Sequence, residues 1–319
     1  MDISSRSGKR ASAAEEGINA RLDEFVALRR DIHENPELAF REHRTSRLVA
    51  SHLSSWGYEV ATGIAGTGIV ATLKKGRGNR NLAIRADMDA LPIEEATGLT
   101  YASRNAGVMH ACGHDGHTTI LLAAARYLAD AGDFSGTVHL VFQPAEEIGA
   151  GARTMLSEDL FGRFPADAVF GLHNWPGVAT GQFGFLAGPA MASVDRATVR
   201  IVGKGGHGAE PQNAVDPVVA AAAFVTALQS VVSRNVDPRE MAVATVGSIH
   251  GGNASNVIPG HVELKLTMRA YSEAVRLQLK KRIPALARAQ AESFGASAEV
   301  DYRLGFPSVV NHPQETAFA

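Results

Sequence analysis

The pattern of hydrophobic and polar residues predicts two helices, followed by strands that alternate with a buried helix. Apolar residues recur at helical spacing over residues 18–32 and 44–56. β-Type apolar runs and one Ala/Leu-rich helix then follow along the chain: strands at 68–73, 82–86, 137–142 and 168–172, and the helix at 118–128. Such alternation favours an α/β sheet, in which ligands bind beyond the carboxyl ends of the strands.

The pattern changes at about Pro189. From there the chain predicts six elements, which are a strand at 197–202, a helix at 215–233, strands at 241–249 and 262–268, a helix at 273–293 and a strand at 298–302. The order βαββαβ is that of a small ferredoxin-like domain. We therefore predict an α/β protein of two domains, preceded by a polar leader over residues 1–17.

Composition narrows the class of protein without choosing an activity. A 45% hydrophobic and 20% charged chain of 319 residues is typical of a soluble globular protein of about two domains. A net charge of −2 argues against a nucleic-acid partner, and no apolar run reaches the roughly 18 residues that span a bilayer. The single cysteine cannot form an internal disulfide, and the leader has no apolar core of a secretory signal. We expect a cytoplasmic enzyme or binding protein.

The segment His110–His117 carries the strongest chemical signal. It holds Cys112, the only cysteine, together with His114 and two more of the twelve histidines. Thiolate and imidazole donors suit zinc, cobalt or manganese better than calcium or magnesium. The alternative is a buried cysteine beside a helix-capping histidine, which the density of further donors disfavours.

Three other loops after predicted strands add donors. Glu146 and Glu147 follow the strand at 137–142, and neighbouring side chains in extended chain point in different directions, so one can bind metal while the other faces water. His173 follows the strand at 168–172, and Asp87 and Asp89 share one strand face. A solvated acidic pair, a rim histidine and a capping aspartate are the alternatives. Together these loops supply the donors of a two-metal hydrolase.

Two other chemistries find no support in the sequence. Residues 66–71 spell a Gly-x-Gly-x-x-Ala string that runs into a β-branched segment, whereas a dinucleotide site needs a helix there. A phosphate-binding loop would end in Gly-Lys-Ser or Gly-Lys-Thr, and the chain has neither.

The chain resembles the metal-dependent aminoacylase and carboxypeptidase superfamily, in the branch of hippurate hydrolase and the plant indole-acetyl-amino-acid amidohydrolases. The resemblance runs in order through seven strings, at residues 31–37, 85–92, 109–117, 142–147, 171–176, 205–208 and 256–259. It implies a catalytic domain over 18–188 and an inserted lid and dimerisation domain over 189–303, with 304–319 returning to the catalytic domain.

The resemblance also implies roles for single residues. Cys112, His114, Glu147 and His173 would bind two divalent ions, manganese or zinc, with cobalt or nickel as alternatives. Glu146 would be the general base and acid, and Asp89 would orient a ligand, whereas the role of Asp87 stays open. In the lid, substrate contacts would come from three residues, His207, Asn256 and Arg269.

The expected reaction is hydrolysis of an N-acyl amino acid to a carboxylic acid and a free amino acid, by a homodimer formed through the lid. Two further possibilities stay open: a deacetylase of N-acetyl-diaminopimelate or N-acetyl-cysteine type, and a non-catalytic metal-binding remnant. The family normally continues beyond Ala319 and supplies a last histidine ligand. We therefore expect this chain to be C-terminally truncated, with weakened metal binding and activity.

Overall fold

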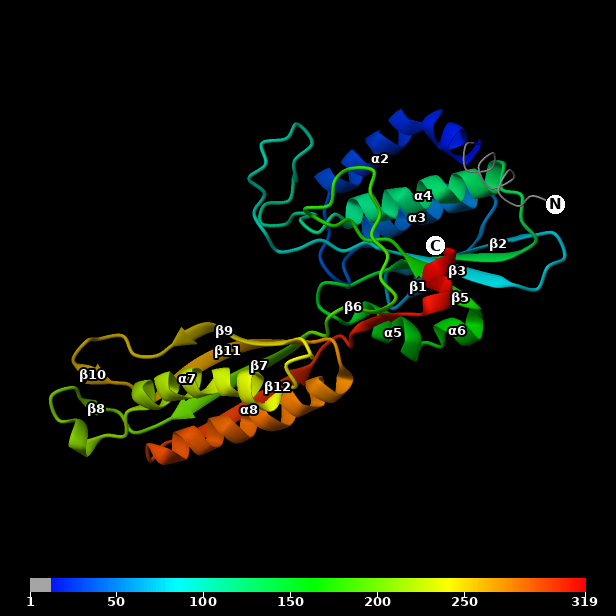
Figure 1. The fold of residues 1–319 in the computed structure, drawn as a ribbon. Helices are drawn as coiled ribbons and strands as arrows, with labels where there is room; N and C mark the ends of the chain where they lie inside the picture. Colours follow the sequence, from blue (N-terminus) through cyan, green and yellow to red (C-terminus); the bar gives the residue numbers. More distant parts are fainter. Residues whose placement is uncertain (1–12) are drawn as a thin grey trace. The chain divides into compact units, whose positions relative to one another are not determined.

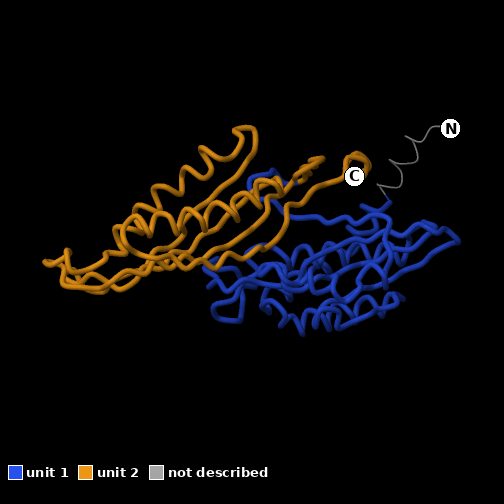
Figure 2. The backbone as a smooth tube through the Cα atoms, turned by 90° about the horizontal axis from the view of Figure 1, so that it is seen from below, with its two compact units in different colours: residues 1–180 blue, residues 181–319 orange. Residues whose placement is uncertain are grey.

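The computed structural model describes residues 13–319, and the chain divides after Thr180 into two compact units (Figure 2). The predicted change of pattern near Pro189 lies close to this division. Of the predicted polar leader, residues 1–12 lie outside the described part of the chain. Residues 13–17, which we expected to be irregular, are helical.

The first unit is built on a five-stranded sheet with the strand order β1-β2-β4-β3-β5. The strands are β1 (Glu59–Ile64), β2 (Gly68–Lys75), β3 (Asn81–Asp87), β4 (Gly136–Gln143) and β5 (Ala168–Gly171). β3 runs parallel to both β4 and β5, so the carboxyl ends of these three strands lie at one edge of the sheet. Four strands match predicted runs, whereas β1 was not predicted.

Helices cover both faces of this sheet. α2 (Leu22–Glu34), α3 (His43–Ser55) and α4 (His114–Asp130) pack on one face, and the short α5 (Gly151–Ser157) and α6 (Leu160–Arg163) on the other (Figure 1). Successive strand residues alternate between the faces: on β4, Leu140 and Phe142 join the first core and Val141 the second.

Two helix predictions for this unit need correction, and two short helices were missed. α4 begins at His114 rather than at residue 118, which places two histidines of the metal-type motif in its first turn. α2 begins at Leu22, because a turn at Ala20 and Arg21 interrupts the predicted helix over 18–32. α5 and α6 are too short to show a helical period and were not predicted.

The second unit is centred on a four-stranded antiparallel sheet with the order β12-β7-β11-β9. In chain order, this sheet and its two helices are β7 (Asp195–Val202), α7 (Pro217–Asn235), β9 (Ala242–His250), β11 (His261–Ala270), α8 (Glu273–Ser293) and β12 (Ser297–Leu304). Their succession is βαββαβ, as predicted. Buried side chains of β7 and β11 form one core with α7 and α8, and the bounds of α8 match the prediction.

Smaller elements complete the second unit. They are β6 (Gly188–Met191), β8 (Gly206–His207), a 3-10 turn at Pro211–Asn213, β10 (Val257–Ile258), β13 (Val309–Asn311) and α9 (Pro313–Phe318). β8 pairs with β10, and β6 pairs with β13. In the described chain, α7 is the helix long and apolar enough to cross a membrane by length and composition. Its side chains Phe224 and Leu228 are fully buried in the core of the unit.

Candidate metal centre

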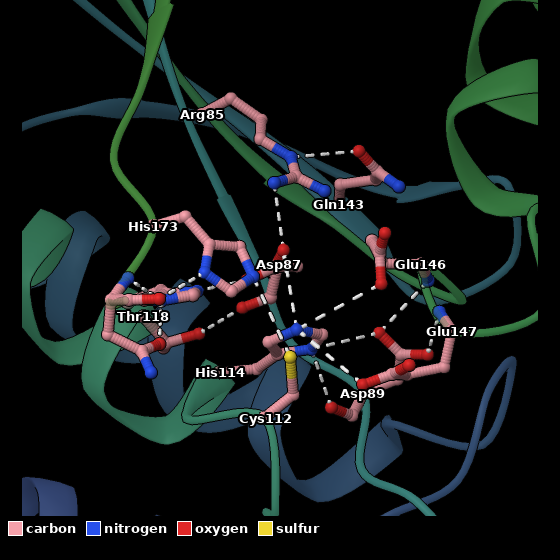
Figure 3. A network of polar contacts seen from close by, with 12 residues as sticks. Arg85, Asp87, Asp89, Cys112, His114, Thr118, Gln143, Glu146, Glu147 and His173 are labelled. Atoms are coloured by element: carbon pink, nitrogen blue, oxygen red, sulfur yellow. Dashed lines mark hydrogen bonds and ion pairs between the residues drawn. The ribbon is translucent and has the colours of Figure 1, made fainter. Parts of the chain in front are cut away.

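The candidate donors gather where three parallel strands end. Asp87 closes β3, Glu146 and Glu147 follow β4, and His173 follows β5. α4 contributes its first residue, His114, at the same edge of the sheet (Figure 3). The sequence prediction that these loops meet is therefore confirmed by the geometry.

His114 lies at the middle of the cluster. Its Nε2 atom is 3.6 Å from Oδ2 of Asp87, 3.8 Å from Oε1 of Glu147 and 4.0 Å from Oε2 of Glu146. Cys112 Sγ lies 3.6 Å from Nε2 of His173. Two donor sets, Cys112–His114–His173 and His114–Glu146–Glu147, each offer atoms that all lie within 4.8 Å of one another.

Among the atoms of these two donor sets, two are buried without a hydrogen-bond partner in the described part of the chain. They are Nε2 of His114 and Oε1 of Glu147, which face each other. A buried polar atom without a partner costs free energy, and a cation between these atoms would satisfy both. The donor set of thiolate, imidazole and carboxylate fits a zinc, manganese or cobalt ion. The residues present therefore fit a divalent metal centre.

Asp89 supports the cluster from behind. Its carboxylate accepts hydrogen bonds from the main-chain N–H groups of Glu146 (2.9 Å) and Glu147 (3.0 Å). Its main-chain oxygen lies 2.9 Å from Nδ1 of His114. That contact makes Nδ1 the donor nitrogen and leaves Nε2 free to face the other ligand candidates.

Asp87 belongs to a second, overlapping group. Oδ1 lies 2.7 Å from Nδ1 of His117, and Oδ2 forms an ion pair of 2.8 Å with Arg85. His117 in turn accepts a hydrogen bond from the main-chain N–H of Asn174 at 3.0 Å. Sequence reasoning gave no role to Arg85, His117 or Asn174. His117 already stood in the metal-type motif, and its i, i+3 spacing from His114 was the available signal.

Gly113 permits the close approach of the loop after β5. Its φ of +87° lies in the left-handed region, and an added Cβ atom would stand 2.7 Å from Oδ1 of Asn174. Any other residue would therefore strain the backbone at this position and displace the Asn174 side chain, which contacts His117.

Burial and mutual repulsion shift the pKa values of the cluster. Burial, followed by the charge of Asp87, raises the pKa of Glu146, and burial also raises the pKa of Glu147. Burial lowers the pKa of His114, but its close contacts with Asp89 and Cys112 and the charge of Asp87 outweigh burial and raise the pKa to about 11. Hydrogen bonds to His114 and His173 lower the pKa of the Cys112 thiol. Several crowded acidic groups thus favour cations at this position.

The predicted substrate residues lie in the second unit, and two of them are neighbours. β8 ends at His207, and the N–H of the next residue, Gly208, donates to the main-chain oxygen of Asn256 at 2.8 Å. Arg269 lies near the far end of β11, opposite Val243 on β9. A strand rises about 3.3 Å per residue, so the length of β11 separates Arg269 from the other two within this unit. All three predicted side chains are exposed.

Comparisons with known proteins point to one family for this chain. Residues 83–319 match the family model of peptidase family M20/M25/M40. The hippurate hydrolase of Campylobacter jejuni is 44% identical over 296 residues, which are 93% of this chain and 77% of that protein. The N-acetyl-L-cysteine deacetylase of Bacillus subtilis is 43% identical over 289 residues, covering 90% and 69% of the two chains.

A solved structure shows the same α/β fold. The YXEP protein of Bacillus subtilis, described as a dinuclear metal binding peptidase, superposes with a TM-score of 0.78 at 35% identity, covering 94% of this chain and 78% of that one. The motif resemblance is thereby confirmed, and the chain belongs to peptidase family M20/M25/M40.

Proposed function

We propose that this amidohydrolase cleaves the amide bond of N-acyl amino acids, releasing a carboxylic acid and a free amino acid. The family match and the relatives named for hippurate and N-acetyl-L-cysteine support the reaction class. The observation that carries the proposal is the adjacent pair Glu146 and Glu147, held by Asp89 beside Cys112 and His114. One carboxylate of such a pair can bind metal while the other handles protons.

Cys112, His114, Glu147 and His173 would hold two divalent ions, manganese or zinc. Bound there, the ions would polarise the amide carbonyl and lower the pKa of water. Glu146 takes the proton from the attacking water and returns it to the leaving amine, which needs a carboxylate that titrates nearer neutrality than usual. Burial and the charges of Asp87 and Glu147 raise its pKa in that direction.

The second unit would supply the substrate contacts. His207 would stabilise the developing oxyanion, and Asn256 and Arg269 would bind the amino-acid carboxylate. Because β11 separates Arg269 from His207 and Asn256 within one chain, a site that uses all three is best completed by two copies. This supports the proposed homodimer through a lid of ferredoxin-like topology. A cytoplasmic location is part of the same proposal.

A second candidate function differs from the first in the acyl group of the substrate. A deacetylase of N-acetyl-cysteine type would use the same residues, and the 43% identity to the Bacillus subtilis N-acetyl-L-cysteine deacetylase favours it over a deacetylase of N-acetyl-diaminopimelate type. Hydrolysis of hippurate and of N-acetyl-L-cysteine, compared by kcat/KM on one preparation, separates the two.

Metal content and one variant test the proposal. After incubation with excess manganese or zinc, we expect elemental analysis to find up to two ions per chain, and we expect hydrolysis of an N-acyl amino acid that is measurable but weak. Glu146→Gln should lower kcat by about 10²- to 10⁴-fold, the contribution of a general base, while the metal content stays unchanged. Equal background hydrolysis by both proteins would leave a metal-binding remnant as the function.

A further inference from the structure

The carboxylate of Glu42 lies completely buried beside the loop that carries Glu146 and Glu147, and it belongs to no ligand set. Glu42 precedes α3, and its fractional exposure is 0%. Oε1 accepts hydrogen bonds from the N–H groups of Ala145 at 2.8 Å and Phe40 at 3.1 Å. Oε2 accepts from the hydroxyl of Thr67 at 2.6 Å. Burial of a carboxylate is costly, and here three donors compensate that cost.

Both main-chain donors belong to residues in an unfavourable conformation. Ala145 has φ of +50° and Phe40 has φ of +60°, in the left-handed region that side chains with a Cβ atom disfavour. Such conformations persist only where the surroundings impose them. The single oxygen Oε1 of Glu42 binds both strained residues, so one side chain fixes the backbone at both places.

Ala145 stands directly before the two acidic residues of the site. Its N–H is held by Glu42, and the next two N–H groups, those of Glu146 and Glu147, are held by Asp89. Three consecutive amides of one loop are therefore fixed by two buried carboxylates from separate segments of the chain. The backbone direction at Ala145 decides where the following two side chains point.

We propose that Glu42 is a positioning residue for the reaction: by holding Ala145 in its left-handed conformation, it aims Glu146 and Glu147 at the metal centre. The inference rests on the proposed function: its kinetic consequence needs the proposed reaction, whereas its effect on metal binding needs only that Glu147 binds metal. Misplacement of a reacting group by about 1 Å can cost about 10²-fold in rate. A loosened loop would therefore lower kcat more than it changes KM.

Three variants of the full chain test the proposal. Glu42→Ala removes the acceptor, and we expect kcat to fall by about 10- to 100-fold with KM changed less than about threefold. Zinc affinity, measured by isothermal titration calorimetry without substrate, should fall by at least about tenfold, because Glu147 is a proposed ligand. Glu42→Gln keeps one oxygen for Ala145 and Phe40, so it should restore both values to within about threefold of wild type.

Glu158→Ala is the matched control. Glu158 accepts a hydrogen bond of 2.8 Å from Ala65, another alanine of the same unit with positive φ (+52°), and it lies outside the set of hydrogen bonds that hold the loop after β4. We expect it to lower the unfolding midpoint and to leave kcat and zinc affinity unchanged. If Glu42→Ala does not fold, Glu42→Asp replaces it, since a carboxylate shorter by one methylene cannot keep all three contacts.

The outcomes separate this inference from the proposed function. If the wild type binds zinc but hydrolyses no N-acyl amino acid, the proposed function fails, and a weakened zinc affinity of Glu42→Ala still supports the positioning role. If the wild type is active and folded Glu42→Ala keeps its kcat and zinc affinity, the positioning role is refuted. An equal loss in Glu158→Ala would also refute it, because the effect would then be a general loss of stability.

Discussion

Asp89→Asn should weaken both the fold and the metal centre, because this carboxylate is the acceptor for two neighbouring amides. The side chain is fully buried and accepts from the N–H groups of Glu146 and Glu147 at 2.9 and 3.0 Å. Asparagine keeps the shape but offers one acceptor oxygen, so one charge-assisted hydrogen bond is lost and one amide stays unpaired. Hydrogen bonds to charged groups contribute about 1.5–3 kcal/mol each, which is the expected loss of unfolding free energy.

The charge effects of the same substitution on Glu147 and on His114 have opposite signs. Removing the negative charge relieves repulsion of the Glu147 carboxylate, whose pKa the Asp89 charge helps to raise. It also removes the attraction to the His114 imidazole, whose Nδ1 lies 3.4 Å from Oδ1 of Asp89. The lost hydrogen bond and the lost attraction to His114 both lower the free energy of unfolding, so we expect Asp89→Asn to be destabilising.

Urea unfolding in the presence of a chelator measures this effect without metal. We expect a lower urea midpoint with an unchanged slope. In a separate titration without chelator, the zinc affinity should be reduced by about 10- to 100-fold, as for other residues that orient metal ligands. Asp31→Asn is the control, since its ion pair with Arg44 is 44% exposed on the Asp31 side and should contribute less than about 1 kcal/mol. Equal stability and equal zinc affinity of Asp89→Asn and wild type would refute the reasoning.

Two further predictions concern other parts of the molecule. Burial lowers the pKa of His110 from 6.5 to about 4, so below pH 6.5 the unfolded chain binds a proton that the folded chain does not bind. His110 should therefore contribute a loss of about 3 kcal/mol to the free energy of unfolding of the metal-free protein between pH 6.5 and 4. The buried acids with raised pKa values, Glu42, Glu146 and Glu147, act in the opposite direction, so the predicted quantity is the difference between wild type and His110→Leu in urea unfolding at both pH values. A pH dependence that His110→Leu leaves unchanged would contradict this origin. Arg276→Ala should lower the free energy of unfolding by about 3–5 kcal/mol, because it leaves the buried Asp195 carboxylate without its 2.7 Å ion pair. The zinc content should stay the same. A loss below about 1 kcal/mol, measured by calorimetry, would contradict this prediction.

Local patterns were sufficient for most elements of the fold. The sequence predicted α8 at its observed bounds and the four strands of the larger sheet of the second unit within a few residues, because each of these elements has one face packed in the core and one exposed face. It did not predict the short strands β6, β8, β10 and β13. β1 escaped prediction because its residues alternate poorly and only its last residue, Ile64, is fully buried. That strand forms through its pairing with β2, which is information outside its own segment.

The start of α4 shows why donor-rich segments mislead a local prediction. His114, Asp115 and His117 are polar, which is typical of a loop, and all three are buried. They can be buried because partners far along the chain satisfy them: His33 contacts Asp115 at 2.8 Å, and Asp87 contacts His117 at 2.7 Å. The residue types identified the candidate ligands, but the partners that bury them were not visible from spacing.

The acidic residues of the first unit fall into two groups. In one group the carboxylate oxygens accept hydrogen bonds from main-chain N–H groups, and in the other group they do not. Glu37 accepts from the N–H groups of two residues at the start of α3, Glu42 from two strained residues, and Asp89 from the two residues after Ala145. By contrast, Oε1 of Glu147 is buried without a hydrogen-bond partner among the described residues. A carboxylate whose oxygens already accept main-chain hydrogen bonds is poorly placed to bind a cation, whereas an oxygen without a partner is available for one. This difference, and not the residue type, distinguishes a supporting acid from a ligand in this family member, and it exists only once the chain has folded.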